Sequence, residues 1–283
     1  MKKILIPTDF SSCAKAAEKY GIALAKKIDA EILFMHIIIT PIVWAKLTPE
    51  QENLFPDKKS EINAAKANLK DLVERAQAMG ISANKLLVYS NGAERINKYV
   101  ESEKVDMVVM GSHGTYGFKE HMLGSNTYSI LRRTNVPVIV IKEGFEHSSL
   151  DTLVIATNFR EETGKSFAQI ENFAELLKAE LKVLYVNTPD HFVETNDILK
   201  IGQSFLDEFA AYNHEINIVD AFREERGIIQ FAKKTQADAV AVITFGKSDL
   251  LQYFSPSVTE NLIAMIDIPV ISLRKNTFLK NND

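Results

Sequence analysis

An internal duplication is the feature that most constrains how this chain can fold. The segment Ile4-Leu-Ile-Pro-Thr-Asp-Phe10 returns 149 residues later as Leu153-Val-Ile-Ala-Thr-Asn-Phe159. Farther along, residues 105–110 match residues 237–242 at an offset of 132, so the first copy carries 17 more residues between the two blocks. Two copies of this size indicate a duplicated domain, because the repeats of solenoid proteins are shorter and more numerous.

The 283 residues accommodate two domains of ordinary size. We expect the first domain at 1–143 and the second at 150–275, since only the stretch from Glu143 to Leu150 leaves room for a linker.

Within the first copy, apolar runs alternate with segments of helical periodicity. This alternation predicts strands at 3–7, 31–38, 86–89, 105–110 and 136–141. It predicts four helices. One starts at Ser11 or Ser12, the second covers 59–79, the third includes 96–100, and the fourth covers 126–133. Alternating strands and helices form parallel sheets with right-handed crossovers. We therefore expect the α/β class, with two doubly wound five-stranded parallel-sheet sandwiches of strand order 3-2-1-4-5.

A glycine-rich loop follows the fourth predicted strand, with the spacing Gly111-x2-Gly114-x9-Gly124-Ser125. Glycine allows the backbone to approach a ligand closely, and a helix that begins near Ser125 directs N–H groups at an anion. The loop lacks the Gly-Lys-Ser/Thr of a Walker motif, and it follows a later strand than the Rossmann glycines do. In the expected strand order it shares the sheet's switch point with Asp9, which predicts a phosphate site there.

Two alternatives stay open for these residues. Asp9 is also a favoured residue for an ordinary helix N-cap, and the glycine loop could simply connect a strand to a helix. The loop residues His121 and Lys119 could assist phosphate binding, although solvated side chains are the default there.

Composition excludes several classes of protein. A net charge of −4 and a pI near 5.9 give no support to nucleic-acid binding. No apolar run reaches the roughly 18 to 20 residues of a membrane span. The single cysteine, Cys13, excludes an internal disulfide and favours the cytoplasm. No residue spacing indicates a metal site or a catalytic triad.

With these motifs the chain resembles a tandem universal stress protein, a member of the UspA-like family with two Usp domains. The residues that carry the resemblance are Pro7-Thr8-Asp9-Phe10, Met110-Gly111-x-His113-Gly114, Gly124-Ser125 and Val136-Pro-Val-Ile-Val-Ile141. The resemblance implies the adenine nucleotide alpha-hydrolase-like fold and ATP binding by the first copy. It leaves open whether AMP or ADP binds and whether Mg²⁺ accompanies the nucleotide.

The implied role is that of a cytoplasmic stress-response sensor or switch, with no catalytic residue and at most weak ATP hydrolysis. A slow ATPase that uses the same pocket and a non-catalytic scaffold are the alternatives.

The resemblance also assigns residues to the nucleotide. It places Asp9 at the adenine edge and Ile37 as an apolar wall beside the base. The backbone N–H groups of Gly124, Ser125 and Asn126 would hold the phosphates. The full set is Pro7, Thr8, Asp9, Ile37, Met110, Gly111, His113, Gly114, Gly124, Ser125 and Asn126.

The second copy departs from this pattern. Asn158, Ile243 and Pro256 stand where the first copy has Asp9, Gly111 and Gly124. We expect this copy to be a degenerate domain that binds no ATP. We also expect that isoleucine at 111 or proline at 124 abolishes binding with little loss of fold.

Two further expectations concern the surface. The resemblance implies that the last strands of such domains pair, here as an intramolecular pseudo-dimer, with a homodimer left open. Composition places the 17 extra residues at 40–60, where Trp44 could belong to a lid over the pocket or to an unrelated surface excursion.

Overall fold

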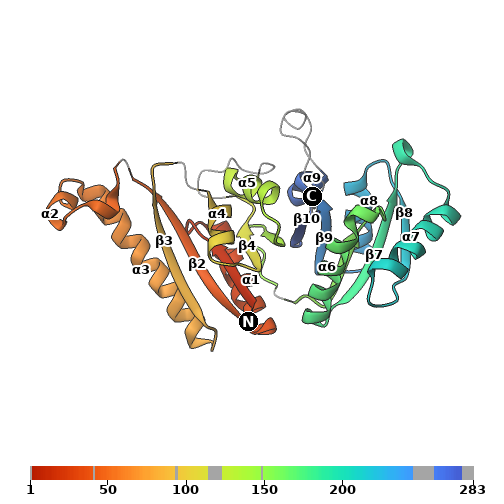
Figure 1. Ribbon diagram of the computed structural model, residues 1–283, viewed down its shortest axis with the longest axis horizontal. Coiled ribbons are helices and arrows are strands. Elements are labelled where there is room, and N and C mark those ends of the chain that lie inside the picture. Colours follow the sequence, from red (N-terminus) through yellow and green to blue (C-terminus); the bar gives the residue numbers. More distant parts are fainter. Residues whose placement is uncertain are drawn as a thin grey trace, which may run out of the picture. The chain divides into compact units, whose positions relative to one another are not determined.

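Both copies of the duplicated sequence fold as α/β units in the computed structural model (Figure 1). The structure describes residues 2–40, 42–92, 95–113, 123–147, 149–244 and 258–275. The first copy contains β1 (Lys2–Pro7), α1 (Ser12–Ile28), β2 (Ala30–Ile39), η1 (Trp44–Lys46), α2 (Pro49–Glu52), α3 (Pro56–Ala78), β3 (Ala83–Ser90), α4 (Ile96–Ser102), β4 (Met107–Gly111), α5 (Ser125–Arg133) and β5 (Val138–Ile141).

The second copy repeats this order of strands and helices. It contains β6 (Thr152–Ala156), η2 (Glu161–Thr163), α6 (Gly164–Leu177), β7 (Glu180–Asn187), η3 (Pro189–His191), α7 (Thr195–Phe209), β8 (Ile216–Asp220), α8 (Glu224–Lys234), β9 (Ala239–Thr244), α9 (Val258–Met265) and β10 (Val270–Arg274).

Strand order confirms the predicted fold class. The first copy has the order β3-β2-β1-β4-β5 and the second has β8-β7-β6-β9-β10, which is 3-2-1-4-5 in each. Within the first copy, β3, β2, β1 and β4 run parallel to one another, and within the second copy so do β8, β7, β6, β9 and β10. Residues 131–140 belong by sequence to the first copy but lie in the second compact unit, where β5 pairs antiparallel with β10.

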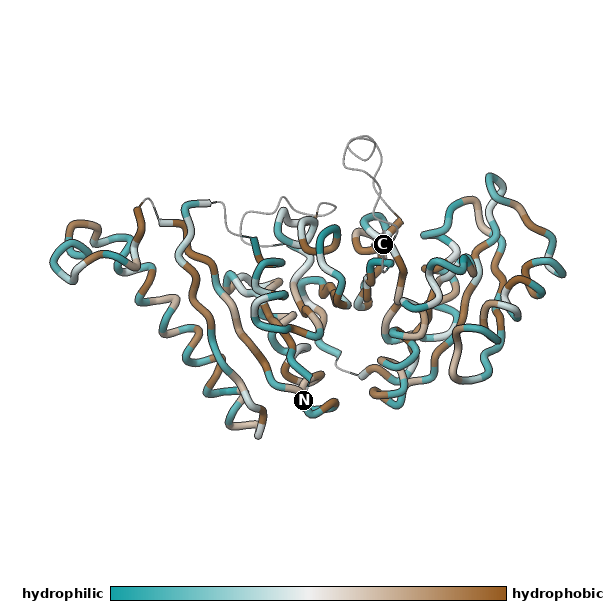
Figure 2. The backbone as a smooth tube through the Cα atoms, viewed as in Figure 1, coloured by the Kyte–Doolittle hydropathy of each residue, from teal (hydrophilic) through white to brown (hydrophobic). Residues whose placement is uncertain are grey.

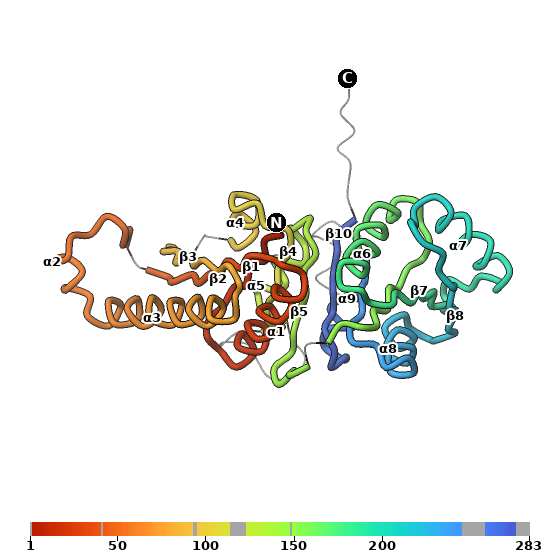
Figure 3. The backbone as a smooth tube through the Cα atoms, turned by 90° about the horizontal axis from the view of Figure 1, so that it is seen from below, coloured from red at the N-terminus to blue at the C-terminus, as the bar shows by residue number. Residues whose placement is uncertain are grey.

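The core of the first unit explains its apolar runs. Ile4, Leu5 and Ile6 of β1 are fully buried, and α1 and α3 lie on one side of the strands with α4 on the other (Figure 3). Strands covered on both faces are apolar throughout, which Figure 2 shows as brown strands beside helices of mixed colour. Leu24 and Ile28 of α1 are buried as well.

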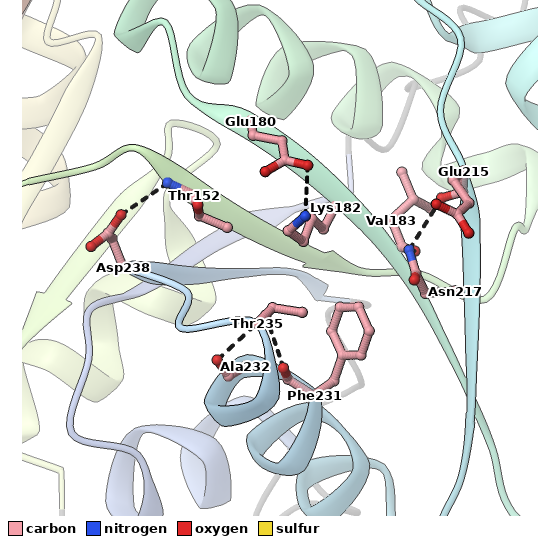
Figure 4. Close-up of polar contacts among 10 residues, drawn as sticks. All are labelled: Thr152, Glu180, Lys182, Val183, Glu215, Asn217, Phe231, Ala232, Thr235 and Asp238. Carbon is pink, nitrogen blue, oxygen red and sulfur yellow. Dashed lines mark hydrogen bonds and ion pairs between the residues drawn. The ribbon is translucent and has the colours of Figure 1, made fainter.

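The amino ends of the central strands are held by the same hydrogen bonds in each copy. Asp106 Oδ2 accepts from the Lys3 amide at 2.8 Å, and the Asp106 amide donates to the Lys3 carbonyl at 2.9 Å. In the second copy the Thr152 amide donates to Asp238 Oδ2 at 2.9 Å (Figure 4). The Asp238 amide donates to the Thr152 carbonyl at 2.9 Å. The duplicated sequence therefore produces a duplicated backbone at this edge.

The extra residues of the first copy are divided between two places, so the expectation that all of them lie at 40–60 is wrong. Residues 40–55 separate β2 from α3, whereas only residues 188–194 separate β7 from α7. In addition, α3 has 23 residues and α7 has 15. The remaining extra residues thus lengthen a helix.

Trp44 is part of the core of the first unit. Its side chain is 3% exposed and packs with Ile38 and Ile62, and its ring lies 6.3 Å from that of Phe55. Figures 1 and 3 both place the neighbouring α2 at the end of the unit away from β4. Phe10, of the turn that carries Asp9, packs against the same cluster, so the lid and the surface excursion both stay predictions.

Candidate functional site

The turn after β1 is fixed by its own side chains. The Thr8 amide continues the strand by donating to Met35 O at 2.8 Å. The Thr8 hydroxyl oxygen accepts from the Phe10 amide at 2.9 Å and holds Phe10 in the left-handed region, at φ 62°. Asp9 Oδ1 accepts from the Ser11 amide at 3.1 Å. The N-cap of α1 is Ser11, whose hydroxyl accepts from the Ala14 amide, so Asp9 is not the ordinary N-cap considered above.

A buried polar network lies beneath this turn. The Thr8 hydroxyl donates to Glu18 Oε1 at 2.5 Å, and Glu18 is 3% exposed. His36 Nδ1 lies 2.6 Å from the Thr8 carbonyl oxygen, which can only accept, so Nδ1 carries the hydrogen. The His36 and Phe10 rings are 4.7 Å apart. Burial raises the pKa of the Glu18 carboxyl, and the hydrogen bond from Thr8 lowers it by less.

Gly111, the last residue of β4, is required by packing. A Cβ there would lie 2.8 Å from Cys13 Sγ and 3.1 Å from the Cys13 carbonyl atoms. Real Cβ atoms essentially never approach as closely as the first of these distances. The close contact between α1 and β4 therefore explains this glycine without a ligand. The expectation that isoleucine at 111 would leave the fold intact is corrected by this geometry.

The residue after Gly111 connects three segments. The Ser112 amide donates to Ile141 O at 2.9 Å, and its carbonyl accepts from the Gly124 amide at 2.9 Å. His113 lies beside it, with Nδ1 3.1 Å from Ser112 Oγ and Nε2 3.6 Å from Glu143 Oε2. Because its amide is already bonded, Gly124 does not offer the phosphate donor that the resemblance assigned to it.

The first turn of α5 has backbone amides that could donate hydrogen bonds to a phosphate. The Gly124 carbonyl accepts from the Tyr128 amide at 2.9 Å, which is the first bond of the helix. The amides of Ser125, Asn126 and Thr127 therefore have no acceptor within the helix. The Thr127 hydroxyl donates to Gly111 O at 2.9 Å and ties this first turn to the end of β4.

Most of the predicted site residues meet at one edge of the sheet. β1 and β4 are adjacent, with Leu5 opposite Val108, so the turn at Asp9 and the end of β4 share the carboxyl edge. Ile37 and Pro7 are half-buried near the ends of their strands. Met110 is 4% exposed, which leaves only its backbone for a ligand.

Two sets of residues complete this comparison. Gly114, Lys119 and His121 lie outside the described residues. Sequence reasoning missed Glu18, His36, Ser112 and Thr127, which act through contacts between elements. The only available signal was the duplication, since the position of Glu18 is occupied by Phe167 in the second copy.

The second copy keeps the turn but changes its surroundings. The Phe159 amide donates to Thr157 Oγ1 at 3.2 Å, and Phe159 has φ 54°. Asn158 is exposed, and Ile243 lies in β9. At the position of Cys13 this copy has Glu162, exposed in the 3-10 turn that precedes α6. Pro256 lies outside the described residues.

The described ranges contain no group of three or more His, Cys, Asp or Glu side chains that could hold a metal ion. Within the same ranges, no helix combines the length and the apolar character that crossing a bilayer requires.

Comparison with known proteins gives the family. The model of the universal stress protein family matches residues 1–142 and 150–274. The chain belongs to this family, and it contains two such domains in tandem.

Curated relatives match a single domain. Universal stress protein MJ0577 of Methanocaldococcus jannaschii is 32% identical over 155 residues, which cover 50% of this chain and 94% of the relative. Universal stress protein MJ0531 of the same organism is 30% identical over 143 residues, which cover 50% and 82%.

Among solved structures, a universal stress protein from Archaeoglobus fulgidus has a TM-score of 0.72 at 18% identity, covering 97% of this chain and 98% of that one. This likeness shows that the tandem fold is shared.

Proposed function

We propose that the first copy binds an adenine nucleotide, with ATP as the leading candidate, and acts as a nucleotide-dependent sensor or switch in a stress response. The observation that carries the proposal is the bond between Thr127 and Gly111, which seats the first turn of α5 on the end of β4. The amides at this turn point out of the helix, where its dipole favours anions. Asp9 lies at the same edge, at the end of the adjacent strand.

The proposed arrangement of the nucleotide follows from these positions. The base lies near Asp9 and Ile37, and the phosphates lie at the amides of Ser125, Asn126 and Thr127. His113, paired with Glu143, lies along the phosphate path. Gly124 contributes by shaping the turn, since its amide is bonded to Ser112.

We assign binding and not turnover to the site. No general base is positioned against the start of α5 by the contacts of the described residues, and family membership supports a binding protein. We also propose that the second copy, which has Asn158 and Ile243, binds no ATP. We propose a cytoplasmic location for the protein because it has a single cysteine.

Isothermal titration of the full chain with ATP, ADP and AMP tests the proposal, together with mass spectrometry of nucleotide retained through purification. Asp9→Asn, which copies the residue of the second domain, should weaken binding. The loss of a hydrogen bond to a charged group is worth about 1.5–3 kcal/mol, or roughly 10- to 150-fold in Kd.

The matched control is Asp190→Asn, an exposed carboxylate that follows β7 in the second copy, and it should bind like the wild type. Equal affinity of Asp9→Asn and wild type would remove Asp9 from the site. No binding of any adenine nucleotide would overturn the proposed function.

A further inference from the structure

The first copy contains a buried carboxyl group that its fold does not require. Glu18 is on α1, is 3% exposed and accepts the hydroxyl hydrogen of Thr8 at 2.5 Å. Burying an ionisable group is unfavourable unless its partners compensate. A residue of this kind next to a candidate binding site is therefore a candidate for a role in that site.

The second copy provides an internal control. At the position of Glu18 it has Phe167, which is fully buried. Its turn nevertheless keeps the same hydrogen bond, from the Phe159 amide to Thr157 Oγ1, and the same left-handed backbone. The carboxyl group is therefore not needed to build the turn. It occurs in the copy that retains Asp9 and is absent from the copy that has lost it.

Charged groups reach Glu18 from three elements. Asp9, in the turn above, opposes its ionisation, whereas Arg75 of α3 and Lys15 of α1 favour it. On β2, His36 contacts the other side of Thr8 through the Thr8 carbonyl. Desolvation is the largest influence and raises the pKa of Glu18 above its ordinary value.

The Thr8 hydroxyl can donate to Glu18 in either protonation state, because both the carboxylate and the neutral acid have an oxygen that accepts. Titration of Glu18 therefore changes the charge below the turn while the hydrogen bond remains. When Glu18 is ionised, a negative charge lies behind Asp9 at the edge proposed to receive a polyanion. Like charges in a poorly solvated region oppose each other, as Asp9 already opposes the ionisation of Glu18.

We propose that Glu18 is a positioning residue of the nucleotide site, and that its charge makes the affinity for nucleotide depend on pH. This inference rests on the proposed function. The bound anion favours neutral Glu18, so binding takes up a proton, and affinity falls as pH rises through the titration of Glu18. The group acts through Thr8 and Asp9, without touching the ligand.

The test is calorimetric titration of the full chain with ADP, in steps from about pH 5 to about pH 8, in two buffers of different ionisation enthalpy. Wild type should lose about tenfold more affinity across this range than Glu18→Gln, which corresponds to a linkage of one pKa unit. Comparing the two proteins on one ligand removes the titration of the phosphates themselves. Glu18→Gln should also lack the proton uptake of wild type while keeping its affinity at low pH.

Two variants complete the design. Glu18→Leu introduces an apolar side chain, as the second copy has at this position, and its affinity should show the same weak dependence on pH. It replaces Glu18→Gln in the test if that variant folds poorly. Glu101→Gln changes an exposed carboxylate on α4 and should behave as wild type. Trp44 emission verifies that each variant is folded.

Parallel pH profiles for wild type and both neutral variants would overturn the inference and leave nucleotide binding intact. A uniform loss of affinity in Glu18→Gln at every pH would also overturn it, because that result indicates a purely structural role. Failure of wild type to bind ADP or ATP at any pH would refute the proposed function and the inference together.

Discussion

Alanine at position 111 should destabilise the first unit, because the added Cβ has no room. It would lie 2.8 Å from Cys13 Sγ and 3.1 Å from the Cys13 carbonyl carbon and oxygen. Overpacking of this kind typically costs about 1–3 kcal/mol. Gly→Ala also lowers the conformational entropy of the unfolded chain, which stabilises the protein and offsets about 0.4–1 kcal/mol of this cost. We expect Gly111→Ala to lower the free energy of unfolding by about 1–2 kcal/mol, with a larger loss for Gly111→Ile.

Urea unfolding followed by Trp44 emission measures this effect, because the only tryptophan is buried in the same unit. The matched background is Cys13→Ala, which removes Sγ but leaves the backbone contacts of residue 13. In that background the penalty of Gly111→Ala should be smaller, and the difference is the coupling between the two side chains. Wild-type stability for Gly111→Ala, or a larger penalty in the Cys13→Ala background, would refute the packing argument.

Two further predictions concern the buried tryptophan and the last strand of the first copy. Since Trp44 is 3% exposed, iodide should quench its emission weakly, and saturating ATP should leave that quenching unchanged. A large change on adding ATP would support the lid alternative. A fragment ending at Gly144 lacks β10, the antiparallel partner of β5. The fragment should therefore self-associate through the exposed edge of β5 in sedimentation experiments. A fragment that stays monomeric at high concentration would contradict the pairing of last strands.

The sequence predicted the architecture because the relevant signals are local and occur twice. Alternation of apolar runs with helical periods identified the strands, and the position of Asp9 and Gly111 after adjacent strands identified the carboxyl edge. The boundaries shifted by a few residues. For example, the third strand covers Ala83–Ser90 whereas the prediction was 86–89.

The parts that failed depend on contacts between distant segments. Gly111 looked like a ligand contact, and only the position of Cys13 reveals that helix packing requires it. Gly124 looked like a phosphate donor, and only the Ser112 carbonyl shows that its amide is already bonded. The burial of Trp44 likewise depends on how α3 meets β2. Tertiary packing decides such roles, and spacing along the chain does not encode it.

Of the two similar domains, only the first is proposed to bind a nucleotide. The most direct measurement is the stoichiometry of ATP binding to the full chain by calorimetry, with the protein first stripped of any retained nucleotide. We expect one ATP per chain, and we expect Asp9→Asn to weaken that single binding event. Two equivalent sites per chain, or no binding to the stripped protein, would contradict this expectation.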